Sequence, residues 1–289
     1  MRRAGLTWDG DPRVKPPFGA AEVDWGHRRV RDPRALWLFS EAAGASAQDV
    51  IMRRHAAWVG SAQHYGVGQP GYVATLPDAA TDYAEAPTSG LQGFARLTIA
   101  AHIFWRGTPT GFNDSNLFTN VTAEASPIDP YQVVALALLG ASGTPGQVFF
   151  ALSTGVAGSR ITLASAEVVS TNRWTSIAVT WDGATMRAFI DGRQSVTTST
   201  FSGTTGTNSI PPRIGLSGAN WGIDRSPFNG DIDYLYVQGA AWSAYDALEQ
   251  HAEPYAMLRP RVARRYFVPA AAAVSGMLPY APRRRRLIA

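Results

Sequence analysis

The carboxylates of Asp231 and Asp233 come nearest, by type and spacing, to catalytic residues in this sequence. Alternate residues of a β-strand share one face, and glycoside hydrolysis uses two carboxyl groups, one as acid and one as nucleophile or base. The next position on that face is Leu235 instead of a third acid, and aspartate is shorter than glutamate. We therefore expect structural carboxylates on a strand and predict that the protein is not an enzyme.

Oxygen donors suited to a calcium ion lie in Asn113–Asn116 and at Asp129. Ca²⁺ prefers carboxylate, amide and carbonyl oxygens, but Asn and Asp are also ordinary turn residues. Calcium is therefore an open alternative to the prediction that no cofactor is bound. The absence of cysteine excludes thiolate zinc sites, disulfides and cysteine nucleophiles. The five histidines show no ligand spacing; they are His27, His55, His64, His102 and His251.

A loop rich in Gly and Asn carries the residues best suited to holding a sugar. Trp221 stands beside Asn220, with Asp224 and Phe228 downstream. An aromatic ring flanked by such residues can stack on a pyranose ring or on a partner protein. The alternative is a tryptophan packed under its own loop. These four residues are our candidate carbohydrate site.

Basic segments stand at both ends of the chain, in residues 1–34 and 254–289. They contain several prolines and no sustained period of two or 3.6 residues, so we expect extended arms. Arg283–Arg286 could contact phosphates, yet the interleaved apolar residues suit docking to a protein equally well, and we predict no nucleic acid. The predicted partner-binding residues are Trp8, Trp25, Arg28, Arg29, Arg259, Arg261, Arg264, Arg265, Tyr266, Phe267, Arg283, Arg284, Arg285 and Arg286.

Between the arms the sequence predicts an all-β domain over residues 35–253. Apolar residues make up 45% of the chain and charged residues 17%, which permits a large core. Short apolar runs alternate with Gly, Pro, Asn and Asp clusters. The expected strands are Trp58–Val59, Tyr72–Leu76, Ala95–Trp105, Leu117–Val121, Gln132–Leu139, Gln147–Ser153, Arg160–Ser165, Trp174–Trp181, Thr185–Ile190, Gln194–Thr198, Arg213–Leu216 and Asp231–Val237.

Two local signals are specific. Asp182-Gly183 joins two alternating runs and predicts a tight hairpin, with a second turn at Asp191-Gly192. Ser243 predicts the N-cap of one short helix that ends before Pro254. Met1–Gly10 lacks the apolar run of a signal peptide, so we expect synthesis in the cytoplasm and no membrane association.

The segment Arg173–Gly192 resembles the central hairpin of laminin G-like, concanavalin A-like jelly rolls. Leu97–Trp105 and Phe228–Ser243 match the same pattern, and the resemblance covers about Ala35 to His251. It implies two antiparallel sheets stacked face to face. It implies no single activity, because this fold serves lectins, glycosidases, adhesion modules and virion proteins.

The arms, joined to such a jelly roll, resemble structural proteins of tailed bacteriophages. Our first hypothesis is a non-enzymatic virion subunit, either a capsid decoration, a head fibre or a tail-associated protein. Its arms would bind capsid, tail or portal subunits, with self-association in the virion. Deletion of Pro254–Ala289 should then abolish assembly and leave the jelly roll folded. The alternative is an adhesin that binds host surface glycans.

Overall fold

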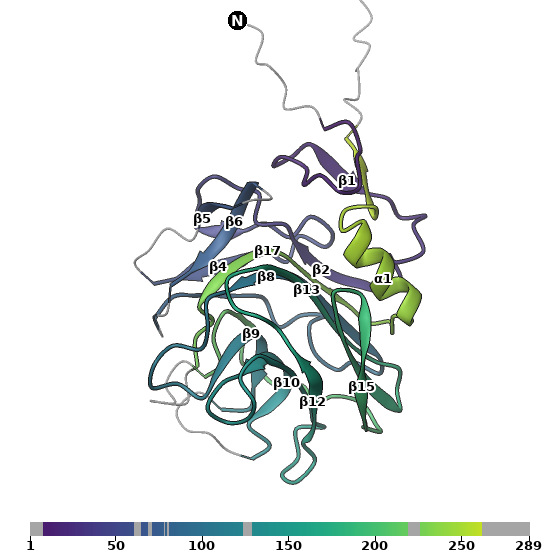
Figure 1. Cartoon of the computed structure of the whole chain (residues 1–289). Coiled ribbons are helices and arrows are strands. Elements are labelled where there is room, and N and C mark those ends of the chain that lie inside the picture. The colour runs from purple at the N-terminus through teal and green to yellow at the C-terminus, as the bar shows by residue number, and fades with distance from the viewer. Residues whose placement is uncertain are drawn as a thin grey trace, which may run out of the picture.

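The computed structural model describes residues 8–60, 65–68, 71–77, 79, 81–123, 129–218 and 226–261. Strands dominate it, and every strand pair is antiparallel (Figure 1). One short helix, α1 (Ala244–Ala252), follows the last long strand. The predicted all-β jelly-roll sandwich is confirmed. No helix in the described ranges is long and apolar enough to span a membrane.

Two large sheets form the sandwich. The sheet that carries α1 on its outer face is called here the helix-side sheet. Its strand order is β15 (Arg193–Thr200), β14 (Thr185–Ile190), β13 (Trp174–Trp181), β8 (Leu97–Trp105), β17 (Gly230–Gln238), β6 (Gly71–Leu76) and β5 (Tyr65–Gly68), and β2 (Pro33–Trp37) also pairs with β17. The far sheet has the order β12 (Ile161–Val168), β11 (Gln147–Leu152), β10 (Gln132–Leu139), β9 (Asp114–Val121), β16 (Arg213–Ile214), β7 (Tyr83–Glu85), β4 (Ala56–Val59) and β3 (Ser46–Ala47).

The main core lies between these sheets and is built from alternate residues of the facing strands. In β11, for example, Val148, Phe150 and Leu152 enter the core while Phe149 does not. Trp37 and Trp181 are among the largest side chains that the sandwich buries completely.

The predicted hairpin turn at Asp182-Gly183 is present between β13 and β14. Gly183 has φ +101°, and the Asp182 carboxylate accepts hydrogen bonds from the backbone N–H groups of Ala184 and Thr185 at 2.9 and 2.8 Å. Gly192 lies in the second turn at φ +75°, and a Cβ there would approach Leu248 Cα to 2.9 Å. This close contact lets α1 pack onto the sheet.

A second apolar cluster covers the outer face of the helix-side sheet. Tyr234 and Tyr236 of β17 lie beneath Trp8, Trp242 and residues 255–258. Strand β1 (Ala21–Val23) pairs with β18 (Leu258–Pro260) above them. The expectation of extended arms is therefore wrong for residues 8–34 and 254–261, because their apolar side chains have a sheet face to cover.

All twelve predicted strands overlap strands of the structure, and α1 begins after the N-cap Ser243, as predicted. Sequence reasoning missed six strands, β1, β2, β3, β5, β7 and β18. Each has two to five residues, too few to display a period.

Candidate functional site

The carboxylates considered first for catalysis lie under the second apolar cluster. Asp233 is fully buried, with its oxygens 2.7 Å from Lys15 Nζ, 2.9 Å from His102 Nδ1 and 2.6 Å from the Tyr255 hydroxyl. Lys15 also donates to the carbonyl oxygens of Tyr72 and Asp233 at 2.6 and 2.7 Å. Burial alone would raise the pKa of Asp233, but Lys15 and His102 hold it below its ordinary value.

The carboxylate of Asp231 also has a charged partner. It pairs with Arg106 at 2.7 Å. The register of β17 against β8 shifts between Ile232 and Tyr234, so Asp233 occupies a bulge. A substrate has no access to a carboxylate that is sealed beneath the terminal segments, and the two aspartates do not form a glycosidase pair.

The predicted sugar-stacking loop is described only in part. Phe228 is fully buried in the main core, so its assignment to a carbohydrate site is wrong. An aromatic residue at a strand start serves the core as readily as the surface, and sequence alone does not separate the two. Asn220, Trp221 and Asp224 lie outside the described residues.

The predicted partner-binding residues divide into four groups. Trp8 and Arg29 are buried within the fold, which corrects their assignment as exposed contacts. Arg28 binds Asp246 and Glu249. Trp25, Arg259 and Arg261 are exposed, and Arg259 pairs with Glu22 at 3.0 Å. Arg264, Arg265, Tyr266, Phe267, Arg283, Arg284, Arg285 and Arg286 lie outside the described residues.

The outer face of the far sheet presents a different arrangement, which no sequence motif had indicated. Arg160, just before β12, extends its guanidinium between two rings, with its carbon 5.4 Å from the centroid of Tyr131 and 5.4 Å from that of Phe149. Among the described residues Arg160 makes no ion pair or hydrogen bond, and its Nε is buried without a partner. Burial lowers the pKa of Arg160, against the opposing charges of Asp114 and Asp129.

Backbone geometry holds this group of residues in place. Tyr131 has φ +65°, a left-handed conformation that is uncommon for an aromatic residue. Its carbonyl oxygen accepts from Thr122 N and Oγ1 at 2.9 and 3.1 Å. Asp129 accepts from the N–H of Gly158 at 2.6 Å, which joins the turn of Tyr131 to the loop that leads to Arg160.

Small neighbours leave the Phe149 ring uncrowded. Its cross-strand partners are Ala137 on β10 and Ala164 on β12. Tyr131 is 38% exposed, and Phe149 and Arg160 are half-buried. We call Asp129, Tyr131, Phe149 and Arg160 the Arg160 cluster. It combines two ring faces, a guanidinium with free donors and a carboxylate acceptor.

Of the residues considered for calcium, Asp129 belongs to this cluster, and Asn113–Asn116 lie at the start of β9. Asp114 accepts from Ser142 Oγ and from the N–H of Gly140, and Asn116 donates to the carbonyl oxygen of Ser226 at 3.0 Å. Within the described ranges no three His, Cys, Asp or Glu residues converge as metal ligands. The negative charges of Asp114 and Asp129 favour the charged form of the Arg160 guanidinium.

Comparison with known proteins places this geometry in a family. The model of the concanavalin A-like lectin/glucanase superfamily, laminin G type, matches residues 78–246. A search of curated protein sequences found no match.

Several solved structures share the fold at low identity. Domain 4 of AbnA, a GH43 extracellular arabinanase from Geobacillus stearothermophilus, solved with arabinotriose, superposes with a TM-score of 0.54 at 15% identity over 80% of this chain and 98% of that one. The binding domain of botulinum neurotoxin serotype G gives 0.53 at 13% identity over 76% of this chain. The binding domain of Paraclostridial Mosquitocidal Protein 1 gives 0.52 at 12% identity over 75%.

This chain spans about half the length of the two toxin domains, 50% and 51%. At these identities the superpositions show the fold alone, whereas the family model covers more than half of the sequence. The chain therefore belongs to the concanavalin A-like lectin/glucanase superfamily.

Proposed function

We propose that this protein is a carbohydrate-binding domain and that the Arg160 cluster is its sugar site. The observation that carries the proposal is a guanidinium held between two partly exposed aromatic rings with no ionic partner in the described part of the chain. Membership in a lectin and glucanase superfamily supports it, as does the arabinotriose bound to a domain of the same fold.

The chemistry of a sugar matches each part of the cluster. The apolar face of a pyranose or furanose ring stacks on an aromatic ring, as other flat apolar groups do. Neighbouring hydroxyls accept from the guanidinium of Arg160 and donate to the carboxylate of Asp129. The cluster contains a positively charged donor, Arg160, and a negatively charged acceptor, Asp129. A sugar therefore needs no net charge to bind there.

A glycan array probed with the full chain identifies the sugar, and calorimetry with the best oligosaccharide then tests the site. Arg160→Gln and Phe149→Ala should each weaken binding about tenfold or more. Arg173→Gln is the matched control, because Arg173 is a half-exposed arginine paired with Asp191 on the other sheet. No binding to any glycan, or equal affinities for all four proteins, would contradict the proposal.

Binding without turnover is part of the same proposal. The two aspartates that sequence reasoning compared with catalytic carboxylates are buried or paired. Incubation of the bound oligosaccharide with the protein should therefore leave the sugar intact by chromatography. Cleavage that disappears in Asp231→Asn would show a glycosidase instead.

The contact between the first and last described segments of the chain favours a second role, attachment to a larger assembly. Tyr255 N–H donates to the Pro12 carbonyl at 2.9 Å, and Arg261 N–H donates to the Ala20 carbonyl at 2.8 Å. The described chain thus begins and ends on one side of the domain (Figure 1). We propose that residues 1–7 and 262–289 attach it there, in a tailed-phage virion, with capsid, tail or portal subunits as partners.

The deletion of Pro254–Ala289 suggested by the sequence has to be shortened to test this role. Tyr255, Met257 and Leu258 belong to the second apolar cluster, so removal of residues from Pro254 onward would damage the fold. Deletion of residues 262–289 spares them and should abolish co-purification with particles while thermal unfolding of the domain is unchanged. Undiminished incorporation of this truncated chain would contradict the attachment role.

A further inference from the structure

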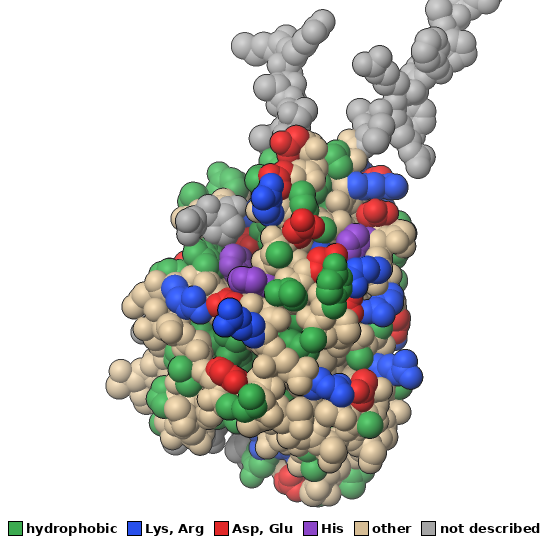
Figure 2. All heavy atoms as spheres, turned by 45° about the vertical axis from the view of Figure 1, so that its right-hand side comes forward, with side chains coloured by type: hydrophobic (Ala, Val, Ile, Leu, Met, Phe, Trp, Pro, Cys, Tyr) green, Lys and Arg blue, Asp and Glu red, His purple; other side chains and the backbone are tan. Residues whose placement is uncertain are grey.

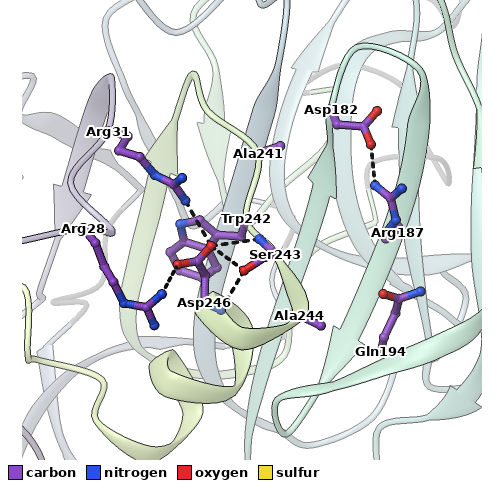
Figure 3. A pocket seen from close by; sticks show the side chains of 10 residues that line it. All are labelled: Arg28, Arg31, Asp182, Arg187, Gln194, Ala241, Trp242, Ser243, Ala244 and Asp246. Atoms are coloured by element: carbon purple, nitrogen blue, oxygen red, sulfur yellow. Dashed lines mark hydrogen bonds and ion pairs between the residues drawn. The ribbon is translucent and has the colours of Figure 1, made fainter.

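A pocket of about 460 Å³ lies where α1 begins, on the opposite sheet from the Arg160 cluster (Figure 3). Its polar side chains come from four parts of the chain: Arg28 and Arg31 from the N-terminal segment, Asp182 and Arg187 from the β13–β14 hairpin, Gln194 from β15 and Asp246 from α1. On this side of the molecule basic and acidic side chains stand next to one another at the surface (Figure 2). The volume falls within the range of small-molecule sites.

Asp246 organises one wall of the pocket. Its carboxylate accepts from the N–H and hydroxyl of Ser243 at 2.9 and 2.7 Å, which closes the capping box of α1. It also holds Arg31 at 3.0 Å and Arg28 at 3.1 Å. Burial opposes ionisation, but the bonds from Ser243 and the two arginines keep the pKa of Asp246 below its ordinary value. The negative charge of Asp246 is therefore already balanced by these partners.

The facing wall is organised in the same way by Asp182. Its Oδ2 pairs with Arg187 Nη1 at 2.7 Å, and its Oδ1 accepts the two backbone bonds of the hairpin turn. In Figure 3 this ion pair stands across the pocket from the Arg28, Arg31 and Asp246 group, with the Gln194 amide beside Arg187. Arg187 keeps its second terminal nitrogen free of protein acceptors among the described residues.

The lining therefore has an excess of positive charge and of donors. Three guanidinium groups meet two carboxylates, and both carboxylates are already satisfied. Glu249 and Arg29, which lie behind the first wall and pair at 3.1 Å, leave this excess unchanged. Trp242 also lines the pocket, and its indole N–H is buried with no acceptor in the described part of the chain. A ligand that complements this lining brings acceptors and one negative charge.

We propose that this pocket binds a small carboxylate-bearing ligand of about the size of a hexuronic acid. The carboxylate pairs with Arg187, whose second terminal nitrogen is free of acceptors in the described part of the chain, and the positive charges of Arg28 and Arg31 on the facing wall add to the attraction. The hydroxyl groups of the ligand reach Gln194 and Ser243. This site is separate from the Arg160 cluster, and its existence does not depend on the proposed function.

Binding of glucuronate, glucose and inorganic phosphate to the full chain, followed by NMR or calorimetry, tests the proposal. Glucuronate should bind at least tenfold more tightly than glucose, which has the same ring without the carboxylate. Competition by phosphate also supports an anion site, and its affinity relative to glucuronate measures the contribution of the sugar ring.

Variants locate the binding. Gln194→Glu changes an exposed amide into an acid of the same shape, spares every ion pair and should weaken glucuronate binding about tenfold. Arg187→Gln should do the same, while Arg173→Gln and Arg160→Gln should bind as the wild type does. Equal binding of glucose and glucuronate, or wild-type affinity in both Gln194→Glu and Arg187→Gln, would overturn the proposal.

Discussion

The cations Lys15 and Arg29 on one outer face of this sandwich differ in their partners from Arg160 on the other face. On the helix-side sheet, the buried charges of Lys15 and Asp233 meet each other, and Arg29 meets Glu249 and Gln250. On the far sheet, Arg160 is half-buried between two rings and has no ionic partner among the described residues. Burying a charge costs free energy unless a partner offsets it. Lys15 and Arg29 thus have partners within the fold, whereas Arg160 is left to bind a ligand in the proposed sugar site.

The largest effect that would test this contrast is expected at Lys15. Lys15→Met leaves the Asp233 carboxylate buried without its cation and should lower the free energy of unfolding by about 3–5 kcal/mol. Urea denaturation measures the loss. Lys15→Met/Asp233→Leu should recover part of it, because neither charge then remains. Arg13→Met is the control, since its pair with Asp11 is exposed. A loss of stability in Lys15→Met no larger than that in Arg13→Met would contradict this expectation.

Arg29 gives the next largest effect on the same face. Arg29→Met leaves the Gln250 amide oxygen and the Glu253 carbonyl without their donor and should lower the free energy of unfolding by about 2–3 kcal/mol. Arg259→Met removes an exposed arginine whose pair with Glu22 should contribute less than about 0.5 kcal/mol. If the denaturation curves of the two variants coincide, Arg29 contributes no more to the free energy of unfolding than an exposed ion pair does.

On the far face, Tyr131→Gly should change binding much more than stability. Glycine accepts φ +65° without strain, which offsets the entropy that glycine adds to the unfolded chain, so the free energy of unfolding should change by less than about 1 kcal/mol. The substitution also removes a stacking ring and should weaken oligosaccharide binding at least fivefold. Asn172→Gly, at φ +59° near the start of β13, is the matched control that should leave binding unchanged. A destabilised Tyr131→Gly with normal binding would show that this ring serves the fold.

The smallest effect concerns Asp182, whose ion pair with Arg187 is partly exposed. Burial opposes the shift, but hydrogen bonds from Thr185, Ala184 and Arg187 lower the pKa of Asp182 to about 2. A lowered pKa contributes stability that is complete above about pH 4 and is lost as the pH falls toward 2. Solvent screening keeps this contribution below about 1 kcal/mol.

Asp182→Asn should therefore be slightly less stable than the wild type at pH 6, and the difference should shrink by pH 2.5 in parallel urea titrations. A difference that grows as the pH falls would contradict the assigned pKa.

The sequence predicted the architecture well because its strong signals are local. Alternation and the Asp182-Gly183 turn define the β13–β14 hairpin, and Ser243 defines the start of α1. The terminal segments were mistaken for arms because their apolar residues, such as Trp8 and Val23, are scattered without a period and find their sheet face only in three dimensions. The Pro-rich, basic composition of these segments favoured extended arms more strongly than their scattered apolar residues favoured packing.

The candidate site could not be predicted, since it depends on long-range placement. Tyr131, Phe149 and Arg160 are separated by 18 and 11 positions, and nothing in their local sequence marks Arg160 as unpaired. Phe228, in contrast, had a suggestive neighbourhood and proved to be buried. Strand register and loop closure decide which side chains meet, and they are properties of the whole sheet.

NMR mapping of the bound oligosaccharide shows whether the Arg160 cluster is the sugar site. Backbone amide shifts of the full chain are followed during titration with the best ligand from the glycan array. We expect changes concentrated at residues 129–131, 147–151 and 158–162, with α1 and β17 unaffected. Changes concentrated on α1, β17 and the N-terminal segment, with the far sheet silent, would contradict it.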